Sequence, residues 1–463
     1  MFPYKKELRY YEISPKFVPA HKSARITIRP LGKHARFPAR VSVFFLPLEE
    51  TTERWSPSMS GSGAAHADMA ADAEQYARIE AEPGDDGCLR VEFTFGNEQK
   101  WFVRVFDRDD ERGPNEFMNR SNQNPVAELA VYALEEDLYR TIPLMGDLHL
   151  HTTGSDGREE GPIVAAAYRR NGFDFIAVTD HFYYEPSVET RRFFEDVPIG
   201  LNICRGEEVH APQNHTHIVN FGGSESINSF WRDHTDEYYA QVNELMAAMP
   251  RYPGVDPFEY AASTLIFQKI RECGGAAIFA HPHWTPNVYH IREAMSDRFF
   301  EDGAFDAFEL VSGYGPKNLL QLALWQEHAA RGHVYPVVGS SDAHVQDDGC
   351  APSSFTRART VVFAEENSER SLVRAVKSHH SVAVQDMPGA EYPLVYGERR
   401  MVKLALFALE EYFPVHDEMC VTEGAWMKAY ALGDEQAASR LRMISGDMPA
   451  LWQKYFPGAF RGE

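Results

Sequence analysis

Two histidines separated by one residue, His149 and His151, precede Asp156 in a glycine-flanked turn. If residues 144–151 form a β-strand, both histidines point to the same face, because side chains alternate along a strand. Their imidazole nitrogens can then converge on one cation, and the turn carries Asp156 towards them. The same spacing also occurs among polar residues of half-exposed strands. Residues elsewhere in the chain are needed to distinguish the two interpretations.

More nitrogen and oxygen donors follow at the predicted ends of later strands. These residues are Asp180, His181, Glu207, Glu208, His217, His281, His283, Asp342 and His344. Each has an ordinary explanation taken singly, as a helix cap, a turn residue or a buried ion pair. Barrels of alternating strands and helices gather catalytic groups at the C-terminal ends of their strands. We therefore expect these side chains to meet in one site.

The elements that would position these residues alternate between strands and helices from Leu144 onwards. Predicted strands cover 144–151, 173–179, 200–209, 217–221, 275–280, 305–311, 334–339 and 359–363, and predicted helices cover 161–171, 258–273, 317–331 and 368–378. This repetition predicts an α/β fold, a parallel β/α barrel within residues 143–400. The polar stretch 225–260 is too long for a simple connection and is expected to be a helical insertion.

The two ends of the chain have different patterns. Residues 1–142 contain short alternating runs such as 24–28, 41–45, 89–93 and 101–105, which predict an accessory β-sandwich. Residues 56–73 are rich in Ser, Gly and Ala and predict a loop, and His66 lies there without a ligand motif. Residues 401–463 predict a mainly helical extension.

Composition excludes several classes of function. The 463 residues favour two or three domains, and a formal charge of -22 opposes binding to nucleic acids or anionic membranes. No run approaches the ~20 apolar residues of a membrane span. The five cysteines, including Cys350, form no paired motif, so we expect reduced thiols and a cytoplasmic protein. The sequence does not support any particular oligomer.

Between Gly146 and Val384 the chain resembles the PHP domain, which is shared by bacterial polymerase subunits and histidinol phosphatases. The motifs that carry the resemblance are Asp147-Leu148-His149-Leu150-His151, Thr179-Asp180-His181, Gly206-Glu207-Glu208, Ala280-His281-Pro282 and Ser341-Asp342-Ala343-His344. The resemblance implies a distorted, TIM-like barrel of seven strands that holds two or three divalent ions.

The resemblance also implies which residues hold each ion. One ion would take His149, His151 and Asp342, and Glu208 would bridge it to a second ion held by His217 and His281. A third ion would take Asp156, His181 and His344. Glu207 competes with Glu208 for the bridging role, because adjacent side chains on a strand point in opposite directions and only one can face the site.

Imidazoles and carboxylates without thiolates suit Zn, Mn or Fe(II) in an open, hydrolytic site. A hydroxide bridging two ions would attack a small anionic phosphate ester, which makes a phosphoesterase the leading hypothesis. The same water could attack the carbonyl of a carbamate or ester, so a carbonyl hydrolase is the alternative. A metal-stabilised binding module is a third hypothesis, and a proofreading exonuclease ranks last.

Other residues have supporting roles in this hypothesis. Asp180, His283 and Glu309 are candidates to orient an imidazole, protonate a leaving group or line the mouth of the site. Arg158 and Lys317 are candidates to hold an anionic substrate. The remaining histidines are expected to be exposed or to cap helices, and they are His210, His215, His234, His290, His328, His333, His379, His380 and His416.

Overall fold

The structure is a computed structural model that describes residues 10–49, 77–111, 124–285, 288, 291–313, 315–346 and 354–460. The predicted loop 56–73, His66, His290 and Cys350 lie outside these residues. Contacts divide the described chain into a larger unit, which holds Ile142–Leu409 and Phe413–Pro449, and a smaller unit. The smaller unit holds the residues up to Thr141, Glu410–Tyr412 and the residues from Ala450.

The first sheet of the larger unit has six strands in the order β11-β10-β9-β17-β18-β19. Their bounds are β9 Ile142–Leu150, β10 Phe175–Val178, β11 Asn202–Cys204, β17 Ala358–Ala364, β18 Ser381–Gln385 and β19 Leu394–Tyr396. Strands β9, β10 and β11 pair in parallel, whereas β17, β18 and β19 are antiparallel to their neighbours. Every residue of β9 is buried, which explains its almost continuous apolar sequence.

The second sheet has five strands in the order β12-β13-β14-β15-β16. Their bounds are β12 Gly206–Val209, β13 Ile218–Phe221, β14 Ala276–Phe279, β15 Ala307–Ser312 and β16 Val337–Ser340. Strand β13 runs antiparallel to β12 and β14, and β14, β15 and β16 pair in parallel. Isolated bridges between Leu150 and Ala343 and between His181 and Glu208 connect the two sheets.

The fold is therefore mixed α/β, and the predicted parallel barrel of seven strands is not confirmed. The run predicted as one strand over 200–209 divides at Arg205 into β11 and β12, which belong to different sheets. The loop from β12 to β13 is too short for the helical crossover that parallel neighbours require, so these two strands pair as a hairpin.

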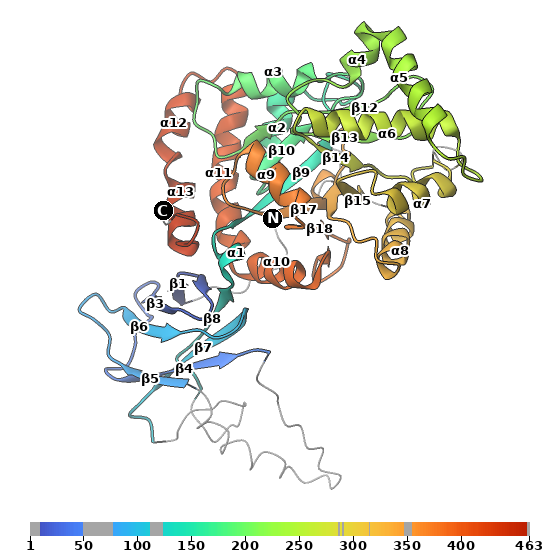
Figure 1. Cartoon of the computed structure of the whole chain (residues 1–463). Helices are drawn as coiled ribbons and strands as arrows, with labels where there is room; N and C mark the ends of the chain where they lie inside the picture. The colour runs from blue at the N-terminus through green and yellow to red at the C-terminus, as the bar shows by residue number, and fades with distance from the viewer. Residues whose placement is uncertain are drawn as a thin grey trace. The chain divides into compact units, whose positions relative to one another are not determined.

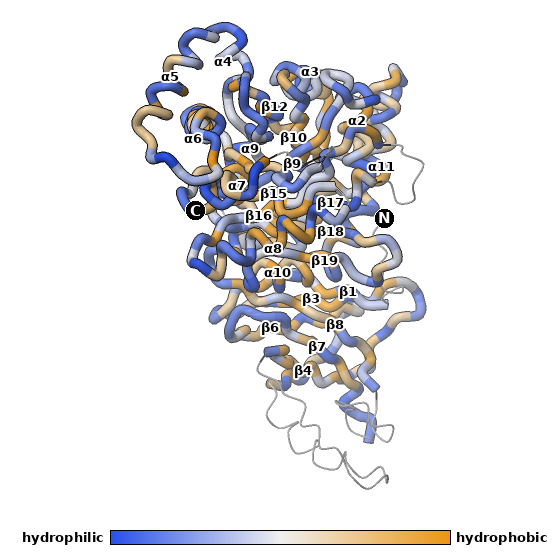
Figure 2. Tube along the Cα trace, turned by 90° about the vertical axis from the view of Figure 1, so that its right-hand side faces the viewer, coloured by the Kyte–Doolittle hydropathy of each residue, from blue (hydrophilic) through white to orange (hydrophobic). Residues whose placement is uncertain are grey.

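Helices flank the strands of this unit (Figure 1). The predicted helices are confirmed as α2 Gly161–Arg170, α6 Pro257–Glu272, α8 Lys317–Ala330 and α9 Glu369–Lys377, and the structure adds α3 Glu185–Phe193 and α7 Glu293–Asp302. Helix α6 begins where Asp256 accepts hydrogen bonds from the N–H groups of Phe258 and Glu259. The insertion is helical, with α4 Asn228–Asp233 and α5 Thr235–Ala248. Figure 2 shows hydrophobic residues along the inner strands and a mixture of hydrophilic and hydrophobic residues along α4 and α5.

The C-terminal region forms helices α10 Arg399–Glu411, α11 Phe413–Ala431, α12 Ala437–Ile444 and α13 Asp447–Tyr455. Helix α11 packs closely on α2, because a Cβ on Gly424 would collide with the backbone of Arg170. Buried Asp174 lies 2.7 Å from Nε2 of His416 and 3.1 Å from the guanidinium of Arg169. The expectation that His416 and His328 are exposed or capping is wrong, since both are fully buried.

The smaller unit contains a three-stranded sheet, β1-β3-β6, and a five-stranded sheet, β2-β8-β7-β4-β5. The bounds are β1 Tyr11–Ser14, β2 Phe17–Pro19, β3 Ser23–Pro30, β4 Val41–Pro47, β5 Ala77–Ala81, β6 Leu89–Thr94, β7 Gln99–Asp107 and β8 Ala127–Leu134, with helix α1 at Glu136–Tyr139. The four short strands predicted here lie within β3, β4, β6 and β7. Residues of both sheets, among them Ile26 and Val43, share one hydrophobic core.

Among the described residues, every helix is too short or too polar to cross a membrane. The four described cysteines, Cys88, Cys204, Cys273 and Cys420, are free thiols.

Candidate metal centre

Strand β9 and the residues after β16 form the first part of the site. The N–H of His151 donates to the carbonyl of Ala343 at 2.9 Å, and the N–H of Asp342 donates to the carbonyl of His149 at 2.9 Å. Asp342 adopts the left-handed region with φ 52°, which is uncommon for a residue with a Cβ. Its Oδ1 lies 3.2 Å from Nε2 of His151 and 3.5 Å from Nε2 of His149.

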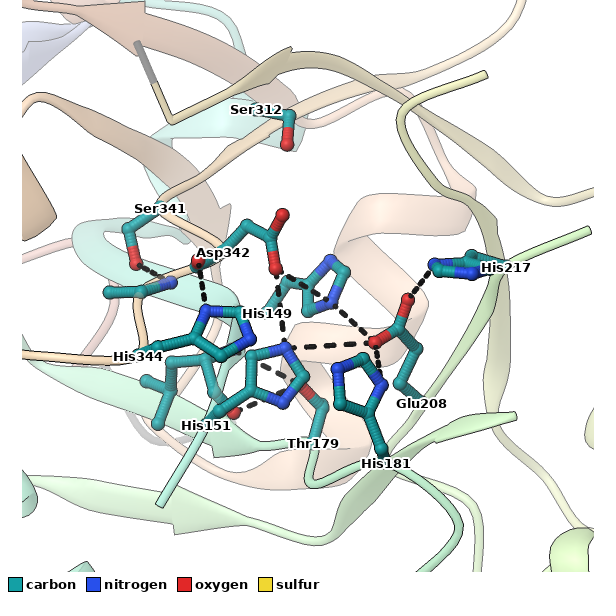
Figure 3. A network of polar contacts seen from close by, with 12 residues as sticks. His149, His151, Thr179, His181, Glu208, His217, Ser312, Ser341, Asp342 and His344 are labelled. Atoms are coloured by element: carbon teal, nitrogen blue, oxygen red, sulfur yellow. Dashed lines mark hydrogen bonds and ion pairs between the residues drawn. The ribbon is translucent and has the colours of Figure 1, made fainter. Parts of the chain in front are cut away.

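Glu208 lies at the centre of the cluster, and its side chain is 0% exposed (Figure 3). Its Oε2 lies 2.7 Å from Nδ1 of His181, 3.3 Å from Nε2 of His149 and 3.6 Å from Nε2 of His151. Its Oε1 lies 2.7 Å from Nδ1 of His217 and 3.4 Å from Nε2 of His281. One carboxylate thus faces nitrogen atoms from these five histidines and from His210.

Glu207 points away from this cluster. Its carboxylate accepts hydrogen bonds from the hydroxyl of Ser226 at 2.9 Å, from the side-chain amide of Asn228 at 2.9 Å and from the N–H of Ile227. These groups lie at the start of α4, where free N–H groups attract a negative charge. The alternation along β12 therefore directs Glu208 to the site and Glu207 to the insertion.

A third group lies nearer the solvent and contains Asp156, His181 and His344. Oδ1 of Asp156 lies 3.3 Å from Nε2 of His344 and 3.6 Å from Nε2 of His181. The Asp156 side chain is 58% exposed, in contrast to the buried Glu208. His151 lies beside this group too, and its ring centroid is 4.2 Å from that of His344.

The sheet pairing explains why residues so distant in sequence meet. His149, His181, His281 and Asp342 lie at or beyond the C-terminal ends of β9, β10, β14 and β16, as expected. His217 instead immediately precedes β13. Because β13 is antiparallel to its neighbours, its first residue lies at the edge where their last residues lie.

The electrostatics of the group favour ionised carboxylates. Burial alone would raise the pKa of Glu208, but His217 and His149 hold this pKa well below its ordinary value. Burial opposes ionisation of Asp342 as well, and His149 and His151 hold its pKa well below the ordinary value. Burial lowers the pKa of His217 to about 3, although the negative charge of Glu208 opposes this shift. The site therefore offers anionic oxygens and an imidazole that resists protonation.

These donors fit divalent cations. Among the described residues, five groups of three or four donors have ligand atoms within 4.8 Å of one another, and together they contain all nine residues assigned to ions in the sequence. Within the described part of the chain, Nε2 of His149 and both carboxylate oxygens of Glu208 are buried, and their contacts with the neighbouring side chains lack good hydrogen-bond geometry. Buried polar atoms left in this way are costly unless a cation satisfies them.

Glu309 and Asp180 lie behind the donors. Oε2 of Glu309 lies 2.9 Å from Nδ1 of His149, and both side chains are fully buried. Asp180 accepts hydrogen bonds from the N–H and hydroxyl of Thr152 at 2.8 and 2.6 Å and from the hydroxyl of Ser155 at 2.6 Å. Glu309 therefore orients an imidazole, and Asp180 holds the turn before Asp156 rather than facing the donors.

The other predicted residues lie around the site. His283 is partly buried and belongs to none of the donor groups found among the described residues. Nζ of Lys317 donates to the hydroxyl of Ser312 at 3.2 Å, and Ser312 pairs with Ser340, two residues before Asp342. Arg158 is exposed, and its N–H donates to the carbonyl of His344 at 2.9 Å. The two cations thus lie on segments that border the donors.

The expectation that His210 is merely exposed or capping is wrong. Its Nε2 lies 2.8 Å from Nδ1 of His181 and 3.5 Å from Oε2 of Glu208. The signal was present in the sequence, because residues two apart at the end of a strand share a face and His210 follows Glu208 by two. His210 lies outside the motifs that carry the resemblance, so it was not predicted to face the site.

Comparisons of the whole chain give structural neighbours alone. No protein-family model and no curated protein matches the sequence. A two-domain protein of Bacteroides vulgatus that contains a predicted PHP-like metal-dependent phosphoesterase aligns at 17% identity and a TM-score of 0.40, over 58% of this chain and 70% of that chain. The chain is similar to PHP-like phosphoesterases.

Two further solved structures match over smaller parts of the chain. A candidate metal-dependent phosphoesterase of Bifidobacterium adolescentis aligns at 18% identity and a TM-score of 0.31, over 43% of this chain and 87% of that chain. An amidohydrolase of Chromobacterium violaceum, with bound sulfate and no metal, aligns at 18% identity and a TM-score of 0.29, over 45% and 89%. At these low scores the similarity assigns no residue role, and the roles rest on the geometry above.

Proposed function

We propose that the chain is a metal-dependent hydrolase, and specifically a phosphoesterase that cleaves a small phosphate ester. The observation that carries the proposal is the Glu208 carboxylate, which is buried, lies within 3.6 Å of nitrogen atoms of six histidines and makes no contact of good hydrogen-bond geometry with the described residues. A purely structural carboxylate in such a position would be expected to be neutral or hydrogen-bonded. Two or three divalent ions, such as Zn, Mn or Fe(II), suit these nitrogen and oxygen donors.

Each residue group has a distinct role in this proposal. His149, His151 and Asp342 would hold one ion, His217 and His281 a second, and Glu208 would contact both. Asp156, His181 and His344 would hold a third. Bound divalent ions in such a site polarise phosphoryl oxygens and lower the pKa of a water molecule.

The protein supplies orientation and charge. Glu309 fixes the ring of His149, and Asp180 fixes the turn that carries Asp156. Lys317 borders the site through Ser312 and would attract the negative charge of a phosphate ester. The partly exposed edge formed by Asp156 and His344 would admit a small substrate.

The test is phosphate release from model phosphoesters after reconstitution with Zn, Mn or Fe(II). The wild type should be active, and His149→Ala and Asp342→Ala should lose activity and bound metal. His333→Ala is the matched control, because His333 lies outside the donor groups of the described residues. Full activity in either ligand variant would contradict the site assignment.

A panel of aryl esters and carbamates separates this proposal from carbonyl hydrolysis by the same site. Turnover of carbonyl substrates without any turnover of phosphoesters would replace phosphoesterase with carbonyl hydrolase. Bound metal together with absence of all turnover would favour a metal-stabilised binding module.

A further inference from the structure

Four aromatic rings form a continuous row beside Glu208, and we refer to Phe182, His210, His217 and Trp284 as the aromatic arc. The ring centroids of Phe182 and His210 are 4.8 Å apart, those of His210 and His217 are 4.3 Å apart, and those of His217 and Trp284 are 5.8 Å apart. These separations are typical of interacting aromatic rings. The arc is therefore a chain of ring contacts that links four separate positions of the sequence.

The aromatic arc has exposed rings at its two ends and contacts the candidate metal ligands in its middle. Its two ends are exposed, Phe182 by 51% and Trp284 by 37%, whereas His217 is only 9% exposed. Nδ1 of His217 lies 2.7 Å from Glu208, and Nε2 of His210 lies 3.5 Å from the same carboxylate. A molecule held at the ions would thus have exposed rings beside it.

The backbone of Phe182 supports a functional position for this ring. Its φ of 66° lies in the left-handed region, which is rare for a bulky residue and tends to persist where function requires it. Its N–H donates to the carbonyl of Glu208 at 3.3 Å. The backbone that carries the exposed ring is therefore hydrogen-bonded to β12, the strand that supplies the central carboxylate.

Aromatic rings of this kind can bind either a flat uncharged ring or an organic cation. The surroundings favour the uncharged ring, because divalent ions at Glu208 would repel a cation. Stacking would remove apolar surface of Phe182 and Trp284 from water. Because the arc lies beside the donors, a ring bound there would lie next to the phosphate of an ester held at the ions.

We propose that the aromatic arc binds an aromatic group on the alcohol portion of the substrate, so that the preferred substrates are aromatic phosphate esters. This inference rests on the proposed hydrolysis of a phosphate ester. Phe182 and Trp284 are then specificity-determining residues, and they take no part in the bond cleavage itself.

Binding of inert phosphonates to the metal-loaded protein tests the proposal without turnover. Calorimetry should show that Phe182→Leu and Trp284→Leu each weaken phenylphosphonate roughly 2- to 12-fold, the range of one aromatic contact, and leave methylphosphonate unchanged. Phe182→Tyr keeps the ring and should bind as the wild type does. Phe193→Leu is the matched control, because Phe193 is also exposed but contacts Phe194 and Tyr430.

Steady-state kinetics provide a second test of the same proposal. For phenyl phosphate, Phe182→Leu should raise KM by a similar factor and change kcat little, and the constants for methyl phosphate should stay the same. Equal losses for the phenyl and methyl probes would overturn the proposal, as would tighter binding of phosphocholine than of phenylphosphonate. Phosphoester hydrolysis without phenyl selectivity would refute the arc alone, and selective phenylphosphonate binding without hydrolysis would refute the phosphoesterase alone.

Discussion

Oε2 of Glu309 lies 2.9 Å from Nδ1 of His149, and neither side chain is exposed. The contact leaves Nε2 of His149 directed at Glu208 and Asp342. A carboxylate that is hydrogen-bonded to the non-coordinating ring nitrogen of a ligand histidine fixes both the ring orientation and the tautomer. The candidate metal centre therefore depends on β15, a strand that supplies none of the proposed ligands.

We expect Glu309→Gln to weaken metal affinity roughly 10- to 100-fold, which is the usual effect of losing such a partner. Competition with a chelator measures the affinity, and circular dichroism reports whether the fold is retained. Glu366→Gln, at an exposed position, should leave the affinity unchanged. A folded Glu309→Gln protein with wild-type affinity would show that the contact does not orient His149.

Asp180→Asn should disturb the turn that carries Asp156. The carboxylate accepts three hydrogen bonds from Thr152 and Ser155, and an amide replaces one acceptor oxygen by a donor. The expected loss of stability in the metal-free protein is about 1–3 kcal/mol. Elemental analysis of the reconstituted variant should also show less bound metal, whereas Asp233→Asn should behave as the wild type in both measurements.

Gly146→Ala should destabilise the larger unit. A Cβ at this position would overlap the ring of Phe175 on the neighbouring strand. Overpacking of a buried site costs about 1–3 kcal/mol, and here it would also displace the strand that carries His149 and His151. Gly446→Ala is the control, because its Cβ would meet no described heavy atom within 4 Å. Urea unfolding of the two variants makes the comparison, and equal midpoints would contradict the close approach.

The Asp174–His416 contact should make stability depend on pH in the acidic range. Burial would raise the pKa of Asp174, but His416 and Arg169 lower it below the ordinary value of 3.8. A carboxyl whose pKa is lowered by folding adds stability above its unfolded pKa, and this stability disappears as pH falls through the folded pKa.

Asp174→Asn removes the titrating group and leaves His416 and Arg169 without their buried carboxylate. At neutral pH it should cost about 3–5 kcal/mol of unfolding free energy. The difference from the wild type should shrink as the pH falls below 3.8. Urea titrations at several pH values measure the difference, and a pH-independent difference would argue against an ionised Asp174.

Many of the secondary-structure elements and candidate ligands can be predicted from local sequence. The helices α2, α6, α8 and α9 and most of the strands were predictable, because their apolar spacing and flanking turns are properties of short segments. The identity of the donors was predictable as well, since histidines and carboxylates at strand ends suit a metal site wherever the chain places them.

The tertiary structure alone decided how these pieces meet. The antiparallel pairing of β13 brought His217 to the site from the start of a strand, and the alternation of β12 separated Glu208 from Glu207. The tertiary structure also placed His210 beside His181 and directed Asp180 to the turn that contains Thr152. Strand direction and long-range pairing depend on contacts between distant segments, and no single segment of the sequence contains that information.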